Sequence, residues 1–147
     1  MAPIVASVEI SRTPADVFGY VTDPSRLPEW QESVVRVAEH QGPATAGTRV
    51  AVTRKAGPRE MTMTSEIAEL DPPRSWAIRG VDGPVRGNVD GRIEPVDGGA
   101  RSRVTIELDL QGHGIGKLLV PLFVKRQAER ELPANMQRLK ERLETAP

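Results

Sequence analysis

Polar and apolar residues alternate along most of the chain before residue 110, and this period of two predicts β-strands. The clearest case is residues 101–110, where Val104, Ile106 and Leu108 share one face and charged side chains occupy the other. Gly, Pro and Asp residues separate the segments by short connections, which favours an antiparallel meander. Strands are expected at residues 4–10, 34–39, 48–55, 60–70, 75–80, 85–94 and 101–110.

A short helix is expected directly after the first strand. Thr13 supplies a capping hydroxyl, Pro14 suits the first helical position, and Asp16 complements the exposed N–H groups of the first turn. The residues expected to face inward are Val17, Phe18 and Val21.

A much longer helix is expected at residues 115–144, where apolar residues recur with helical spacing. Its expected buried stripe is Ile115, Leu118, Leu122, Leu132, Met136, Leu139 and Leu143. The charged residues Lys125, Arg126 and Glu129 interrupt this stripe. Pro133 removes the helical hydrogen bond to the carbonyl of Glu129, which predicts either a kink or a helix that restarts there.

One amphipathic helix after a run of strands needs an apolar surface to pack against, and the concave face of the sheet is the surface that remains. A curved sheet that packs on a helix commonly leaves a cavity between them. The length of 147 residues fits one domain, so we expect a single α+β domain over residues 1–147.

Composition excludes several classes of function. The chain contains no cysteine, so disulfides and thiolate zinc sites are excluded. Its formal net charge of zero gives no electrostatic reason to expect nucleic acid or an anionic membrane as a partner. The N-terminus lacks the features of a signal peptide, and the longest apolar run, 118–124, is far shorter than the ~20 residues of a spanning helix. We therefore expect a cytoplasmic protein without stable membrane insertion.

Several short motifs, in order and over nearly the whole chain, are similar to one known family. They are Val8-Glu9-Ile10, Pro14-Ala15-Asp16-Val17-Phe18, Leu27-Pro28-Glu29-Trp30, Gly47-Thr48, Leu70-Asp71-Pro72-Pro73-Arg74 and Asp97-Gly98-Gly99, followed by the helix over 118–144. The chain thereby resembles the START-like (SRPBCC), helix-grip superfamily, in particular its polyketide cyclase/dehydrase and lipid-transport group. The resemblance implies a seven-stranded curved antiparallel sheet around a long C-terminal helix, with two short helices after the first strand.

The resemblance also implies that a small hydrophobic molecule occupies the cavity between sheet and helix. The residues expected to line this cavity are Tyr20, Met61, Met63, Ser65, Ile67, Trp76, Ile78, Val89, Ile93, Leu118, Leu122 and Glu129. Plain core packing remains an alternative for the apolar members, because aromatic and methionine side chains on an inner face usually belong to the core.

Few residues suggest chemistry beyond binding. His40 and His113 lack carboxylates at metal-ligand spacing, so we interpret both as loop residues and expect no metal site. Arg126 and Glu129 form an i, i+3 pair, which is either a surface ion pair or a polar anchor inside the cavity. Ser65 has no activating histidine at a predictable position, so we assign no catalytic residue and no cofactor.

Three functions stay open from the sequence. The first is a carrier or sensor for a small hydrophobic or aromatic, lipid- or polyketide-like ligand. The second is an aromatase/cyclase or dehydrase that acts on a polyketide chain in the same cavity. The third is a structural or interaction protein whose own side chains fill the space. The protein is expected to be a monomer or a homodimer.

Overall fold

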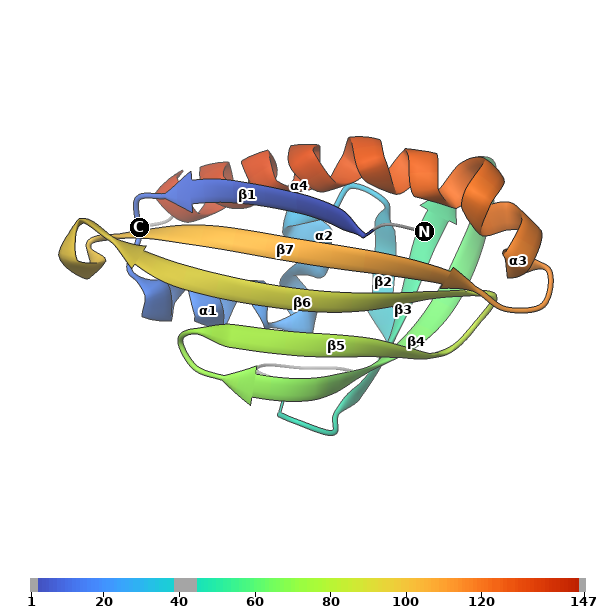
Figure 1. Cartoon of the computed structure of the whole chain (residues 1–147), viewed down its shortest axis with the longest axis horizontal. Helices are drawn as coiled ribbons and strands as arrows, with labels where there is room; N and C mark the ends of the chain where they lie inside the picture. Colours follow the sequence, from blue (N-terminus) through green and yellow to red (C-terminus); the bar gives the residue numbers. More distant parts are fainter. Residues whose placement is uncertain (1–2, 39–44, 146–147) are drawn as a thin grey trace.

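A computed structural model describes residues 3–38 and 45–145; the side chains of Leu119, Pro121 and Leu122 lie outside this description. Its main element is a seven-stranded antiparallel sheet that curls around one long helix, α4 (Figure 1). The strands are β1 (Ile4–Ile10), β2 (Val34–Ala38), β3 (Arg49–Ala56), β4 (Arg59–Asp71), β5 (Ser75–Asp82), β6 (Val85–Val96) and β7 (Arg101–Gly112). Their order is β1-β7-β6-β5-β4-β3-β2, which confirms the predicted fold.

The register between β1 and β7 explains the two faces of the sheet. Val8 pairs with Val104 and Ala6 with Ile106, so apolar side chains meet on the concave face. On the convex face Glu9 pairs with Arg103, whose Nη2 lies 2.7 Å from the carboxylate. The predicted alternation is therefore confirmed on these strands.

Helix α1 (Pro14–Val21) begins as its sequence predicts. The Thr13 side chain accepts a hydrogen bond of 3.3 Å from the Asp16 N–H, and Pro14 occupies the first helical position. Val17, Phe18 and Val21 are buried. Two short elements follow, the 3₁₀ turn η1 (Pro24–Arg26) and α2 (Leu27–Trp30).

The C-terminal helical region has three parts. They are α3 (Gly116–Leu119), the π-helical turn η3 (Val120–Val124) and α4 (Lys125–Thr145), with α3 set at an angle to α4 (Figure 1). Helix α4 runs through Pro133 without a break, so the restart considered at that residue is wrong. The interruption of the helical region lies at η3 instead. Leu132 and Met136, on either side of the proline, are both buried, and this packing favours a continuous helix at Pro133.

The π turn also changes which side chains face inward. A π turn closes an i→i+5 bond and so contains one residue more than an α turn, which rotates the faces before and after it. Ile115 and Leu118 are 68% and 67% exposed, although they were expected in the buried stripe. After the turn the expectation is confirmed, since Leu132, Met136, Leu139 and Leu143 are all buried.

The C-terminal end of α4 is fastened to the end of β1. Lys140 Nζ donates to the carbonyl of Glu9 at 2.9 Å, and the Ser11 N–H donates to Glu144 Oε2 at 2.8 Å. Arg12 Nη1 donates to the carbonyl of Leu143 at 2.7 Å. These bonds fix the helix over one end of the concave face and leave space beneath its other end.

Candidate functional site

A cavity of about 230 Å³ lies between the concave face of the sheet, the first half of α4 and the short helices. Its wall is mainly apolar, and all central strands contribute to it. The apolar lining residues are Val21, Pro24, Leu27, Trp30, Val50, Val52, Ala56, Met61, Met63, Ile67, Leu70, Trp76, Ile78, Val85, Val89, Ile106, Leu108, Leu110, Val124, Ala128 and Leu132. This volume exceeds the ~150 Å³ of an engineered apolar cavity that binds benzene.

The structure brings most of the expected lining residues together around this space. Those in the wall are Met61, Met63, Ser65, Ile67, Trp76, Ile78 and Val89. Period-two alternation on β4, β5 and β6 places them on one side of the sheet, as the sequence indicates. Their part in binding a ligand stays a prediction.

Trp76 depends on a glycine across the strand pair. Gly91 is its partner on β6, and a Cβ added there would overlap the indole ring. The ring meets Phe18 edge-on, with centroids 6.3 Å apart and an interplanar angle of 80°. The absence of a side chain at Gly91 therefore lets the indole lie flat against the sheet at the base of the cavity.

Other expected lining residues lie elsewhere. Ile93 is 3% exposed and packs in the main hydrophobic core beyond the cavity wall. Leu118 points outward because the π turn rotates α3 relative to α4. The side chain of Leu122 lies outside the described residues.

Tyr20 does not line the cavity, and its side chain contacts other protein groups. Its hydroxyl donates to Glu29 Oε1 at 2.8 Å, and the Arg26 guanidinium lies 5.0 Å from the ring centroid. Burial, followed by the bond to Glu29, raises the pKa of Tyr20 to about 12. The phenol is therefore neutral and already paired at physiological pH.

The polar candidates from the sequence are on the surface. Glu129 and Arg126 are exposed on α4, so the anchor interpretation of this pair is wrong. Extending the stripe from Leu122 by α-helical steps leads to Glu129, whereas the π turn moves the inward positions to other residues. His113 is exposed in the turn before α3, and His40 lies outside the described residues.

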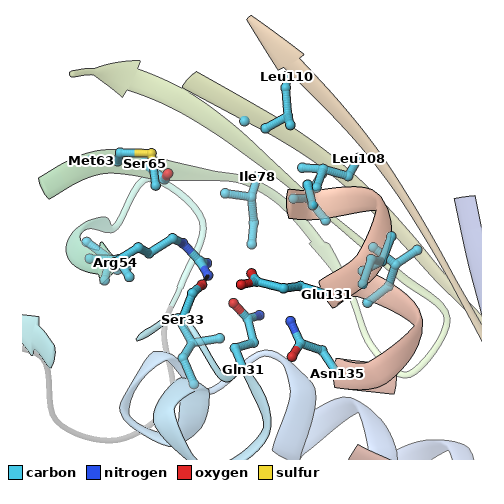
Figure 2. A pocket seen from close by; sticks show the side chains of 18 of the residues that line it. Gln31, Ser33, Arg54, Met63, Ser65, Ile78, Leu108, Leu110, Glu131 and Asn135 are labelled. Carbon is cyan, nitrogen blue, oxygen red and sulfur yellow. Dashed lines mark hydrogen bonds between the residues drawn. The ribbon is translucent and has the colours of Figure 1, made fainter. Parts of the chain in front are cut away.

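A polar cluster that the sequence interpretation missed occupies one end of the cavity. It consists of Gln31, Ser33, Arg54, Glu131 and Asn135, all of which line the cavity. In Figure 2 Arg54 reaches from β3 and Glu131 from α4 toward the same space, with Gln31 and Asn135 nearby. The cavity thus has an apolar body and one polar end, as expected for a site that orients its ligand.

Arg54 is the central group of this cluster. Its Nη1 donates to Ser33 Oγ at 3.2 Å, and within residues 3–38 and 45–145 no carboxylate comes within ion-pairing distance of its guanidinium. Burial lowers the pKa of Arg54 to about 10, and the charge of Glu131 opposes this shift. Arg54 therefore keeps its positive charge at neutral pH and retains donors for a ligand.

The other members of the cluster are held by the protein. Gln127 Nε2 donates to Glu131 Oε1 at 2.9 Å and to the carbonyl of Lys55 at 2.9 Å. The Glu32 N–H donates to Asn135 Oδ1 at 3.1 Å, which connects α4 to the end of α2. Arg54 thus lies in a cluster in which Ser33, Glu131 and Asn135 are each held by at least one hydrogen bond to the protein.

Two sequence signals could have revealed this cluster. Val50, Val52 and Arg54 alternate along one strand, so Arg54 shares the inner face with the two valines. Counting back by four from Met136 gives Leu132 and Ala128, and this stripe has Glu131 and Asn135 beside it. Counting from the C-terminal end of the helix avoids the error that the π turn introduces.

Residues 3–38 and 45–145 contain no group of three or more His, Asp or Glu side chains placed to hold a metal ion. Within the same ranges, no helix combines the length and the apolarity that crossing a bilayer requires.

Comparison with known proteins identifies a matching family and solved structures with the same fold. The model of the family described as "Polyketide cyclase / dehydrase and lipid transport" matches residues 1–144. No curated protein matches the sequence. Solved structures match over nearly the full length of both chains, at sequence identities that establish the fold alone.

Three of these structures illustrate the range. The Zhui aromatase/cyclase from Streptomyces sp. R1128 has a TM-score of 0.77 at 17% identity, covering 97% of this chain and 93% of its own. A START superfamily protein from Mycobacterium smegmatis has a TM-score of 0.76 at 15% identity, covering 98% of both chains. A protein from Thermus thermophilus has a TM-score of 0.76 at 20% identity, covering 96% of both.

Proposed function

Because this chain belongs to the polyketide cyclase / dehydrase and lipid transport family, we propose that it is a binding protein for a small, largely apolar molecule. The ligand occupies the cavity beneath α4 and carries an acidic or strongly hydrogen-bond-accepting oxygen at one end. The observation that carries this proposal is an apolar cavity of about 230 Å³ that ends in the charged side chain of Arg54.

The apolar wall supplies the larger part of the binding free energy. Removing about 150 Å² of ligand surface from water is worth roughly 4 kcal/mol at ~25 cal/mol per Å². The methionines Met61 and Met63 can adapt to the shape of the ligand, since their side chains are unbranched. Loss of translational and rotational freedom offsets part of this gain, so the apolar wall alone supports weak binding.

The polar end supplies orientation. A charge-assisted hydrogen bond contributes about 1.5–3 kcal/mol, and a guanidinium offers two parallel N–H groups to a carboxylate. Arg54 is bonded only to the Ser33 hydroxyl and has no ion pair within the described part of the chain, so an anionic ligand would neutralise it. A carboxylate or an enolised carbonyl at the end of a ring system or short chain fits this arrangement.

Two related fluorescent probes test the proposal. 8-Anilinonaphthalene-1-sulfonate is an aromatic anion, and N-phenyl-1-naphthylamine has the same rings without the charge. We expect both to bind the wild-type protein with enhanced fluorescence. Arg54→Met should weaken the anionic probe about tenfold or more and leave the neutral probe unchanged. Equal effects on both probes would remove the assigned role of Arg54.

A matched pair of substitutions on β4 tests the location. Ser65 faces the cavity, so Ser65→Trp should fill it and abolish the binding of both probes. Its neighbour Glu66 lies on the other face in a half-exposed ion pair with Arg49, so Glu66→Trp adds the same side chain outside. Unchanged binding in Ser65→Trp, with the fold intact by circular dichroism, would place the ligand elsewhere. Native mass spectrometry of freshly expressed protein would identify a retained molecule.

The second candidate function is an aromatase/cyclase or dehydrase that acts on a polyketide-like chain. The charged end of the cavity favours it, because a fixed guanidinium could stabilise the oxyanion that develops on a carbonyl during ring closure. A short poly-β-ketone thioester incubated with the protein distinguishes the two. A carrier returns the molecule unchanged, whereas a cyclase yields an aromatic product and loses this activity in Arg54→Met.

A further inference from the structure

The most exposed large apolar side chains of the described residues gather in one short segment. Ile115, Leu118 and Phe123 are 68%, 67% and 64% exposed. Ile115 and Leu118 are three positions apart, and Phe123 follows Leu118 by five residues across the π turn, so the three project from one side. We call them the α3–η3 ridge. Clustered exposure of this kind marks an interaction surface, whereas single exposed apolar residues are ordinary.

The charge around the ridge differs from that of the chain as a whole. Between Asp109 and Glu129 the segment contains Lys117, Lys125 and Arg126 and no Asp or Glu, so residues 110–128 carry a charge of +3 in a chain whose net charge is zero. Lys117 and Arg126 are exposed, and none of the three cations forms an ion pair with a described carboxylate. An apolar ridge with unpaired basic side chains beside it complements a surface that is apolar beneath and anionic on top.

The ridge is held rigidly by the sheet. The His113 N–H donates to the carbonyl of Pro84 at 2.9 Å, and the Gly116 backbone lies so close to that carbonyl that a Cβ would overlap it. This contact fixes α3 against the turn between β5 and β6, at the end of the molecule seen beside the α3 label in Figure 1. The backbone that carries Ile115 and Leu118 is therefore held in place by the sheet.

The opposite face of the same turn reaches the interior. Val120 is 1% exposed, and Val124 lines the cavity together with Val85 and Leu110 from the neighbouring strand ends. The segment that carries the ridge outside thus forms part of the cavity wall inside. A surface that binds the ridge would lie directly against this end of the cavity.

We propose that the α3–η3 ridge docks the protein reversibly onto an anionic lipid bilayer. Ile115, Leu118 and Phe123 enter the boundary between headgroups and acyl chains, while Lys117, Lys125 and Arg126 contact the acidic headgroups. The mode is peripheral, since three side chains on a short helical segment reach only the outer part of the bilayer. The docked orientation brings the cavity end beneath Val124 to the membrane, where an apolar ligand is dissolved. This docking does not depend on which ligand the cavity holds.

Vesicle co-sedimentation tests the proposal with the full chain. We expect binding to phosphatidylcholine vesicles that contain phosphatidylserine, weaker binding without phosphatidylserine, and loss of the difference in high salt. The double substitution L118S/F123S should lower partitioning about tenfold or more, because it removes the buried apolar area. The charge reversals Lys117→Glu and Arg126→Glu should weaken binding only to the anionic vesicles.

Val5→Ser is the matched control, because Val5 is 57% exposed on β1, outside the ridge. Binding of N-phenyl-1-naphthylamine in the absence of vesicles shows that each variant keeps its fold and its cavity, and it separates failure of docking from failure of ligand binding. Absence of vesicle binding by the wild type, or equal binding by L118S/F123S, would overturn the proposal. So would a wild-type dimer in sedimentation that becomes a monomer in L118S/F123S, since the ridge would then bind a second copy.

Discussion

Gly91→Ala is expected to destabilise the protein through a single side chain. The added Cβ would overlap the Trp76 indole, which is 4% exposed and packed against Phe18. The overlap falls on the ring itself and not on a flexible end, so relief requires a shift of the indole or of β6. Overpacking of this kind typically costs about 1–3 kcal/mol.

The same substitution elsewhere provides the opposite result. Gly19 lies in α1, is exposed, and has no atom near the position of an added Cβ. Gly19→Ala should therefore stabilise the protein by roughly 0.5–1 kcal/mol, because glycine in a helix costs backbone entropy. Equilibrium urea unfolding measures both changes, with the slope against denaturant as a check that the unfolding mechanism is unchanged. At this chain length each kcal/mol should move the melting temperature by about 2–4 °C.

A double-mutant cycle with Trp76→Phe identifies the cause. The smaller ring leaves room for the methyl group, so Gly91→Ala should cost less in the Trp76→Phe background, with a coupling of about 0.5–3 kcal/mol. Weaker binding of the neutral naphthylamine probe in Gly91→Ala would accompany the effect, because Trp76 lines the cavity. The reasoning is refuted if Gly91→Ala changes the free energy of unfolding by less than about 0.5 kcal/mol, or if the two substitutions are additive.

Three further predictions concern charge and close packing. Arg54→Met should raise the free energy of unfolding by about 1 kcal/mol and weaken the binding of anionic ligands. The pKa of Arg54 is lowered to about 10, so the folded protein keeps this charge at a cost in stability throughout the neutral range. Wild-type affinity for 8-anilinonaphthalene-1-sulfonate should be constant from pH 7 to about 9 and fall as the pH rises through about 10. The hydrogen bond from Lys140 lowers the pKa of Glu144, so the stability that this carboxylate contributes is present above its unfolded pKa of about 4.3 and is lost as the pH falls through the lower folded value. The urea midpoints of the wild type and of Glu144→Gln should therefore differ at pH 7 and converge in acid. A difference that stays constant with pH would contradict this prediction. Gly116→Ala should cost about 1–3 kcal/mol and reduce vesicle binding, because its methyl group would overlap the Pro84 carbonyl; unchanged sedimentation would mean that α3 is not fixed there.

Local patterns were sufficient to predict most of the fold. Alternation located all seven strands, and the Thr13-Pro14 pair located the start of α1, because each of these signals acts between residues close in sequence. The same alternation predicts that Met63, Ile78 and their neighbours share the inner face, and these residues line the cavity.

The candidate site was predicted only in part, and the reason is the helix. The phase of a long helix is set by every turn along it, and the π turn at Val120–Val124 breaks the α-helical spacing. Extrapolation from Leu122 therefore led to Glu129, whereas Glu131 lines the cavity and Leu118 is exposed. Arg54 was overlooked because a charged residue on an inner face contradicts the usual pattern, and such contradictions tend to occur at functional sites.

The amino-acid order alone specifies which elements form and which face of each strand is apolar, since these depend on spacings of two to four residues. Folding in three dimensions was needed to bring Arg54 and Glu131 to one end of a cavity, to lay Trp76 against Gly91, and to leave Leu118 and Phe123 outside. These arrangements join residues far apart in the chain, and they depend on strand register, helix phase and close packing, which no local spacing encodes.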